Sequence, residues 1–315
     1  MRETPPLFDL QGHRGARGLR PENTLAGFAH ALAIGVSTLE LDTGVTRDGV
    51  LVVSHDTALN PDHTRDASGR WLERTGPTIF SLTLADLQAF DVGRLRPGTA
   101  YAARFPEQLA VDGERTPRLA DVFDLVKRSG NTEVRFNIET KVDPRKPDAT
   151  PRPDAFAEAL VREIRVAAME KRAMIQSFDW RTLGIVQRIA PDIETVCLTT
   201  QHGDDDNIGL GRPGPSPWLG GLDPDDFGGS VPRLVKAAGA AVWSPDFTEL
   251  TPQLVAEAHT LGLRVIPWTA NDQEDMARLI DMHIDGLITD RPDILRHVLQ
   301  QKGAGFRASP IIAPQ

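Results

Sequence analysis

Short apolar runs alternate with amphipathic helical segments along most of this 315-residue chain. Most of the apolar runs show no strict alternation of polar and apolar residues, which favours strands buried on both faces of a parallel sheet. Strands that alternate with helices form parallel sheets with right-handed crossovers, so the chain is predicted to be an α/β protein. The nine predicted strands are 7–13, 37–43, 50–55, 134–140, 173–178, 194–199, 240–245, 264–270 and 285–290.

One of these nine strands does not fit a parallel arrangement. Only the hexapeptide GVTRDG separates the strand at 37–43 from the strand at 50–55. A parallel crossover takes about a dozen residues or more, and RDG is typical of a turn. Residues 50–55 are therefore predicted to return antiparallel beside 37–43. The other eight strands can close a (β/α)8 barrel, the TIM-barrel fold.

The chain is predicted to form a single barrel domain, 1–315, with an insertion subdomain at 56–118 that follows the returning arm. The insertion is rich in Pro, Gly and Asp, and without it the chain has about 250 residues, the usual size of such a barrel. A second long loop, 201–230, is rich in Gly and Pro and is predicted to form a lid or rim.

Composition excludes several classes of protein. The net charge of −9 gives no general electrostatic reason to bind nucleic acid or an anionic membrane, so neither partner is expected. The single cysteine, Cys197, excludes an intrachain disulfide framework and is predicted to be a core residue. No apolar run reaches the ~18 residues of a membrane span, and MRETPPLFDL lacks the apolar segment of a secretory signal. The sequence as it stands is expected to be cytoplasmic, although a chain whose leader had been removed would read the same way.

Acidic side chains gather where the strands end, which is where active sites of (β/α)8 barrels lie. Glu40 and Asp42 are two residues apart and point to the same side of one strand. Glu139, from another strand, can supply a third carboxylate. Three carboxylates without Cys or His spacing favour one hard divalent cation, Ca²⁺ or Mg²⁺. Ion pairs with Arg or Lys in a barrel-mouth network are the alternative.

Two histidines reach the same rim. His13 ends the first strand, and the turn at 47–49 brings His55 opposite residue 41, beside the carboxylates. Two histidines that flank a cation suit general acid–base catalysis, in which one removes a proton and the other delivers one. A histidine at a strand end can also be a purely structural hydrogen-bonding group. The remaining histidines fall in predicted helices or loops and are interpreted as structural or solvated.

Cations and an aromatic ring complete the predicted substrate site. Arg14 and Lys141 beside a metal form an anion clamp, for which phosphate is the expected guest. Lys141 could instead only balance Glu139. Gln176 ends the next strand at the same rim, and Trp268 is a candidate apolar wall for an alkyl or polyol group. Together these residues favour phosphodiester cleavage.

The motifs GHRGARGLRPENT, LELDTGVTRDGVLVVSHD, NIETK, IQSF, PWTAND and DGLITDRPD resemble those of the glycerophosphodiester phosphodiesterases. The resemblance extends from about residue 10 to residue 295 and includes the spacing between the two histidines. It implies a phosphatidylinositol-phospholipase-C-like barrel that hydrolyses glycerophosphodiesters to glycerol 3-phosphate and an alcohol. It also implies a divalent ion on Glu40, Asp42 and Glu139, with His13 and His55 as acid and base.

The same resemblance extends to three further features. Arg14 and Lys141 would hold the phosphate, and Arg47 stands where many relatives have lysine. In PENT, Asn23 is expected to cap the following helix, and Glu22 to support the metal or contact a substrate hydroxyl. The insertion is similar in length to that of periplasmic members, which keeps a periplasmic location open.

Two rival functions remain at this stage. One is a lipid-directed member of the superfamily, which would need an apolar rim, but loop 201–230 combines few apolar residues with several acids. The other is a binding protein that captures glycerophosphodiesters without cleaving them. Two proton-transfer groups argue against pure binding. The head group, the physiological ion and the oligomeric state are not fixed by the sequence.

Overall fold

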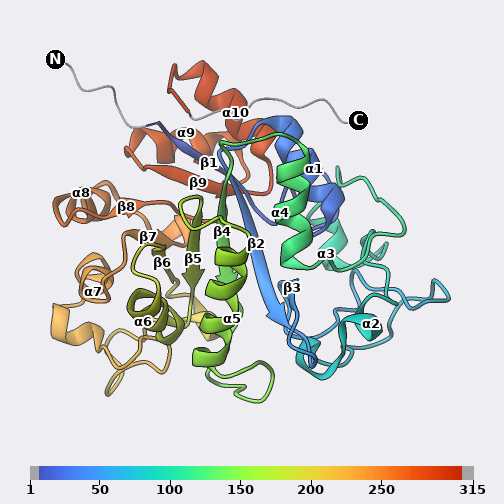
Figure 1. Cartoon of the computed structure of the whole chain (residues 1–315). Coiled ribbons are helices and arrows are strands. Elements are labelled where there is room, and N and C mark those ends of the chain that lie inside the picture. Colours follow the sequence, from blue (N-terminus) through green and yellow to red (C-terminus); the bar gives the residue numbers. More distant parts are fainter. Residues whose placement is uncertain (1–6, 307–315) are drawn as a thin grey trace.

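Eight parallel strands surround the centre of the molecule and nearly close into a barrel (Figure 1). The structure is a computed structural model that describes residues 7–306. Around the barrel the strands follow the order β8-β7-β6-β5-β4-β2-β1-β9. Their bounds are β1 Asp9–Gly12, β2 Thr38–Val45, β4 Arg135–Thr140, β5 Ala173–Ser177, β6 Glu194–Thr199, β7 Val242–Pro245, β8 Arg264–Val265 and β9 Gly286–Thr289.

The last gap in the barrel lies between the short strand β8 and β9. Two backbone hydrogen bonds span it, from the amide of Asp285 to the carbonyl of Val265 (2.9 Å) and from Ile288 to Pro267 (3.0 Å). On the other side β9 pairs in parallel with β1. The predicted (β/α)8 fold is therefore confirmed.

The extra strand, β3 (Leu51–Val53), pairs antiparallel with β2 outside the barrel order. Thr43 lies opposite Val53, and the backbone amide of Ser54 donates to the carbonyl of Asp42 (3.0 Å). Gly49 has a φ of 81°, which a residue with a side chain adopts only with strain, and its amide closes the turn on Thr46. The predicted returning arm is confirmed.

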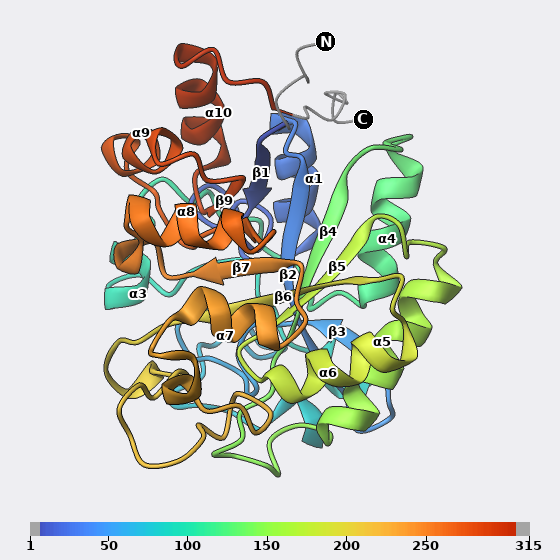
Figure 2. The same ribbon diagram turned by 90° about the vertical axis from the view of Figure 1, so that its left-hand side faces the viewer.

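Helices follow the strands and cover the outside of the barrel (Figure 2). In α5, residues Phe156, Leu160 and Ile164 recur every fourth position and are fully buried. This spacing gives the helix one apolar face, which packs toward the strands. No helix among residues 7–306 is long and apolar enough to cross a membrane. The helices outside the 56–118 segment are α1 Leu25–Ile34, α4 Leu119–Arg128, α5 Pro153–Val166, α6 Trp180–Ile189, α7 Val231–Ala237, α8 Pro252–Thr260, α9 Gln273–Asp281 and α10 Pro292–Gln301.

The N-cap of helix α1 lies one residue later than predicted. The side chain of Thr24 accepts a hydrogen bond from the amide of Gly27 (3.0 Å), so Thr24 is the N-cap. Gly35 ends the helix in the left-handed region. The prediction that Asn23 caps this helix is wrong, because Asn23 has a φ of 54° and its side chain turns away to contact Asp42. Two adjacent residues of capping type cannot be told apart by composition alone.

Residues 56–118 connect β3 with α4 and contain the short helices α2 (Leu84–Leu87) and α3 (Ala100–Ala103) and the 3₁₀ turn η1 (Ile79–Ser81). They have a small apolar cluster of their own, in which Leu59, Ile79 and Leu87 pack on Val52 of β3. The segment lies toward the end of the barrel to which the β2 arrowhead points (Figure 1). The predicted domain extends over 1–315, and its two ends, 1–6 and 307–315, lie outside the described residues.

The core has two unequal parts. A large cluster fills the layer between strands and helices and includes Cys197, which is fully buried as predicted. The barrel interior holds a small apolar group, Met174, Val196, Val242, Ile266 and Ile288. Polar side chains fill the interior beside this group: Gln11, Asn137, Gln176 and Glu40, each at most 1% exposed. Barrels of this kind are usually filled by apolar residues, so this polar group calls for an explanation.

The packing between β4 and α4 gives a test of the fold. Phe136 is fully buried and meets Phe123 edge to face, with ring centroids 4.9 Å apart. We expect Phe136→Ala to lower the free energy of unfolding by about 3–5 kcal/mol, measured by chemical denaturation. The matched control, Phe80→Ala, removes a ring that is 37% exposed and should change it by less than about 1 kcal/mol. Equal losses in the two variants would contradict the described packing.

Candidate active site

A cavity of about 490 Å³ opens at the carboxyl ends of the barrel strands. All but one of the site residues predicted from the sequence line it, although they come from six different strands or their ends. The exception is Glu22, which lies behind Arg14. The predicted residues that line the cavity are His13, Arg14, Glu40, Asp42, His55, Glu139, Lys141, Gln176 and Trp268.

Three carboxylates meet at the bottom of this cavity. Asp42 and Glu139 are register neighbours on β2 and β4, and Glu40 stands two residues before Asp42. Each residue offers an oxygen within 4.8 Å of the others, and none is more than 6% exposed. Burial and the charge of Asp42 raise the pKa of Glu40, and they raise that of Glu139 to about 7. Buried, crowded, oxygen-only ligands fit a hard divalent cation, whose charge would offset this repulsion.

Hydrogen-bond donors approach the cluster from outside. Both oxygens of Glu40 are held, one by the backbone amide of Arg14 (2.8 Å) and one by the Gln176 amide (2.7 Å). The side-chain amide of Asn23 donates to Asp42 (2.9 Å). These contacts fix the orientation of the carboxylates, as expected for groups around a metal site. Gln176 was predicted to contact substrate, and in this structure both ends of its amide are engaged by protein atoms.

Lys141 lies beside the same carboxylates. Its ammonium is 2.8 Å from Glu139 and 3.6 Å from Asp42. This geometry agrees with the interpretation that Lys141 balances Glu139. The side chain also lines the cavity, where its charge can meet an anion. The two roles are compatible, because an ammonium has three donors.

His13 is held by a carboxylate from the far end of the chain. Its Nδ1 is 2.7 Å from Asp290, which follows β9, and Asp290 is also bound by Arg17 (2.8 Å). Arg17 Nη2 also lies 3.2 Å from Nδ1, but the Asp290 contact is much the shorter, and an ionised carboxylate only accepts hydrogen bonds. We therefore assign the proton to Nδ1, which leaves Nε2 with a free lone pair. Nε2 lies 3.9 Å from Glu40. Burial, with the nearby Arg17, lowers the pKa of His13 to about 4.

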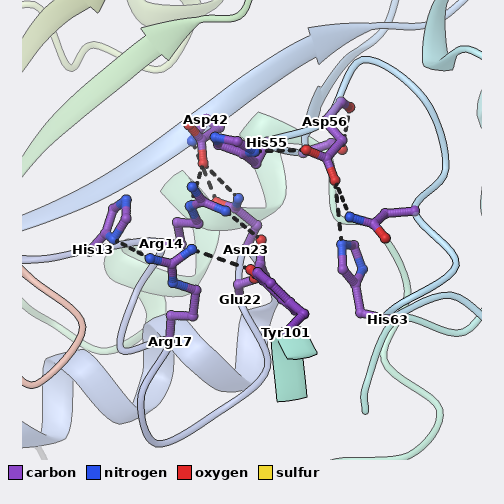
Figure 3. Close-up of polar contacts among 12 residues, drawn as sticks. His13, Arg14, Arg17, Glu22, Asn23, Asp42, His55, Asp56, His63 and Tyr101 are labelled. Atoms are coloured by element: carbon purple, nitrogen blue, oxygen red, sulfur yellow. Dashed lines mark hydrogen bonds and ion pairs between the residues drawn. The ribbon is translucent and has the colours of Figure 1, made fainter. Parts of the chain in front are cut away.

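His55 is held in the same way on the other side. Its Nδ1 is 2.8 Å from Asp56, and Asp56 also accepts from Asn60 (2.7 Å) and lies 3.7 Å from His63 (Figure 3). Burial, with the nearby cations Arg14 and Lys141, lowers the pKa of His55 to about 4, while a third of its side chain remains exposed. Both histidines therefore use Nδ1 for a carboxylate and keep Nε2 for the cavity.

Arg14 is aimed into the site by Glu22. The two side chains pair at 2.7 Å, and the Arg14 Nε lies 3.3 Å from Asp42. Burial opposes ionisation of Glu22, but Arg14, together with His63, Arg17 and the Tyr101 hydroxyl, outweighs it and lowers the pKa of Glu22 to about 2. Tyr101, from α3, donates its hydroxyl to Glu22 and accepts from Arg17 (3.2 Å). The 56–118 segment thus contacts residues around both Arg14 and His13 (Figure 3).

An aromatic wall closes one side of the cavity. Trp268 meets Phe178 edge to face at 5.4 Å, and its indole N–H donates to the carbonyl of Ser244 (2.9 Å). The indole is thereby fixed, and its apolar surface faces the space next to the carboxylates. A smaller cavity of about 280 Å³ continues past these rings toward Trp218.

Several residues of the site were not predicted from the sequence. The motifs quoted above contain Asp290, Asp56 and Arg17, but no role was assigned to them. Asp290 ends a predicted strand, and this position was the available signal. His63, interpreted from the sequence as structural or solvated, is only partly exposed and lies 3.7 Å from Asp56, where it supports a residue of the site. Tyr101 belongs to no periodic segment, and nothing in the sequence pattern marked it.

Comparison with known proteins gives one consistent result. The profile of the glycerophosphoryl diester phosphodiesterase family matches residues 13–294. This chain belongs to that family. The family consists of phosphoric diester hydrolases, and the resemblance seen in the motifs is confirmed. The match includes both histidines and all three carboxylates.

Individual relatives of the family are similar over nearly their whole length. A glycerophosphodiester phosphodiesterase of Caldanaerobacter subterraneus subsp. tengcongensis is 29% identical over 291 residues, which cover 92% of this chain and 97% of the relative. A solved structure from Silicibacter pomeroyi, provisionally assigned to the same activity, is 37% identical, with a TM-score of 0.84 and 96% of each chain covered. An Oleispira antarctica phosphodiesterase, solved with the product sn-glycerol-3-phosphate, shares the fold at 20% identity and a TM-score of 0.67, with 93% of this chain and 97% of the other covered.

The lowered pKa of His13 predicts how the cation-free protein responds to acid. Between pH 6.5 and about 4 the unfolded chain protonates this residue and the folded chain does not. The free energy of unfolding should therefore fall as the pH falls through this window, by up to about 3 kcal/mol from His13. Denaturant titrations at several pH values measure the slope. The pKa of His55 is also lowered to about 4, so His55 contributes to the slope in the same window. His13→Asn, which keeps a donor toward Asp290, should therefore make the slope shallower without abolishing it, and an unchanged slope would contradict the assignment.

Proposed function

We propose that this family member hydrolyses glycerophosphodiesters, such as glycerophosphocholine and glycerophosphoethanolamine, to glycerol 3-phosphate and an alcohol, with one Ca²⁺ or Mg²⁺ ion. One observation carries the proposal: two histidine–carboxylate pairs line the same cavity as three clustered carboxylates. The names of the relatives and the product complex of the Oleispira antarctica protein support the same substrate class.

Glu40, Asp42 and Glu139 would hold the cation. When bound, it would supply positive charge that stabilises phosphate oxygens and acidifies a hydroxyl. Arg14 and Lys141 add fixed charge at the same wall of the cavity and would bind the phosphate. Trp268 would pack against the carbon atoms of the substrate. Glu22 would act through Arg14, because the pair orients the guanidinium.

The two histidines would move the protons. One Nε2 accepts the proton of the attacking hydroxyl. The other histidine, neutral in the free protein, would have to be protonated in the substrate complex, where the phosphate anion favours the charged imidazole, and it delivers a proton to the oxygen of the departing alcohol. In the route we favour, the adjacent glycerol hydroxyl attacks phosphorus, the bond to the alcohol breaks, and a cyclic glycerol phosphate forms. Water then opens this ring with the proton transfers reversed. Direct attack by water is the competing route.

Two substitutions separate proton transfer from cation binding. We expect His13→Ala to lower kcat by about 10²–10⁴-fold and to leave the dissociation constant for Ca²⁺ or Mg²⁺ nearly unchanged. Glu40→Ala removes a ligand and should weaken cation binding itself. Steady-state kinetics and isothermal titration calorimetry measure the two quantities, with circular dichroism as the control for folding. Near-normal turnover by His13→Ala would rule out its catalytic role.

Removal of the cation tests the cofactor. Chelated protein should release no glycerol 3-phosphate from glycerophosphocholine, and Ca²⁺ or Mg²⁺ should restore release in a coupled assay. Lysophosphatidylcholine, assayed in parallel, should be a poor substrate. If the chelated protein retains full activity, the cation is not required. If the loaded protein binds the diester without cleaving it, the function is capture rather than hydrolysis.

The attacking group is tested with substrate analogues. A diester whose glycerol lacks the hydroxyl adjacent to the phosphate cannot form the cyclic phosphate. We expect its kcat to fall by at least about 100-fold, since an intramolecular nucleophile gains several kcal/mol from proximity. Phosphorus NMR during turnover of the intact substrate should detect the cyclic product. Similar rates for the two substrates would favour direct attack by water.

A further inference from the structure

A row of polar side chains crosses the interior of the barrel, from the carboxylate cluster to the opposite end of the strands. It starts at Glu40 on β2, passes through Gln176 on β5, Asn137 on β4 and Gln11 on β1, and ends at Asp9. Its successive donor–acceptor distances are 2.7, 2.8, 2.9 and 2.9 Å. The proposed catalytic steps use only its first member.

The row ends in a carboxylate on each side, Glu40 and Asp9, and these acceptors fix which end of each side-chain amide faces which neighbour. Asp9 accepts from the Gln11 amide nitrogen, so the Gln11 oxygen must face Asn137. Asn137 then donates both of its N–H bonds, one to Gln11 and one to the Gln176 oxygen. With its oxygen satisfied in this way, Gln176 can only present its nitrogen to Glu40.

This direction matters at Glu40. As a cation ligand Glu40 would be ionised. An ionised carboxylate accepts from the Gln176 nitrogen and is repelled by the Gln176 oxygen. A rotation of the Gln176 amide by half a turn would therefore replace an attraction by a repulsion. The oxygen that Gln176 holds is one of two on Glu40, and the Arg14 amide holds the other. The orientation of Gln176 thus decides where Glu40 stands in the carboxylate cluster.

The hydrogen bonding of Asn137 itself points to its two N–H donors. Its side-chain oxygen is buried and accepts no hydrogen bond from a protein group among residues 7–306. Within the protein Asn137 therefore acts as a donor only, and both donors point at glutamine oxygens.

We propose that Asn137 is a positioning residue for the cation site: it fixes the direction of the Gln176 amide and, through it, holds Glu40 in place as a ligand. The inference rests on the proposed cation-dependent function. Asn137 does not line the cavity, and its side-chain donors go to Gln11 and Gln176 rather than to a carboxylate. Its backbone is the register neighbour of Glu40, so the proposed role belongs to its side chain and runs through Gln176.

The test is a double-mutant cycle in cation affinity. Isothermal titration calorimetry with CaCl₂, and separately MgCl₂, gives the dissociation constant for the intact protein. We expect Asn137→Leu to raise it by about 10-fold or more, and Gln176→Leu to raise it at least as much. Because Asn137 acts through Gln176, the double variant should bind no more weakly than Gln176→Leu alone. Turnover by Asn137→Leu should recover when the cation concentration exceeds the new dissociation constant.

A matched control removes a buried hydrogen bond elsewhere. Thr182 on α6 is fully buried and bonds Thr140 (2.9 Å), away from this row. Thr182→Val should lower stability and leave the cation affinity unchanged. If Asn137→Leu does not fold, Asn137→Ser, which loses one of the two donors, is measured against the same criterion.

The outcomes are distinct. A folded Asn137 variant with the wild-type dissociation constant overturns the positioning role. So does a double variant whose losses add, because Asn137 would then act independently of Gln176. If the wild-type protein binds neither cation, the proposed function fails first, and the inference fails with it.

Discussion

The mutual repulsion of three buried carboxylates is the constraint on which the rest of this site depends. Glu40, Asp42 and Glu139 are brought within 4.8 Å by strand register, and burial strengthens their repulsion. Most of the polar groups around them are donors aimed at their oxygens: a backbone amide, two side-chain amides, a guanidinium and an ammonium. The barrel mouth is therefore organised around a cluster of carboxylates whose repulsion the surrounding donors offset in part, and which could hold a metal ion.

A second layer of charge surrounds this centre. Each histidine has a carboxylate at Nδ1, and each of those carboxylates is held in turn by further donors. The sign of the charge therefore alternates from the centre outward. The three carboxylates are followed by cations and neutral imidazoles, and these are followed by the carboxylates of Asp290 and Asp56. Such alternation lets many ionisable groups share a small buried volume, because each charge has an opposite neighbour.

Much of this fold could be predicted from the sequence, because its signals are local. The short TRDG link required an antiparallel return, and the period of that return placed His55 opposite residue 41, as the observed register requires. The position of polar residues at strand ends then indicated which side chains form the site. The role of Asp290 could not be predicted from local signals, because its partner His13 lies 277 residues away and the two meet only when the last strand pairs with the first. Asn23 was assigned wrongly because its backbone takes up a left-handed conformation that composition does not reveal.

The single tyrosine of the chain, Tyr101, has a consequence for how this barrel can be rebuilt. Its hydroxyl lies between Glu22 and Arg17, two buried charged residues of the barrel, although the tyrosine belongs to the 56–118 segment. The segment is thus not a separable module. A shortened or transplanted version would take one hydrogen-bond partner from the buried Glu22 and one from Arg17, which keep Arg14 and Asp290. Chimaeric barrels should therefore exchange the segment and the 13–23 loop together.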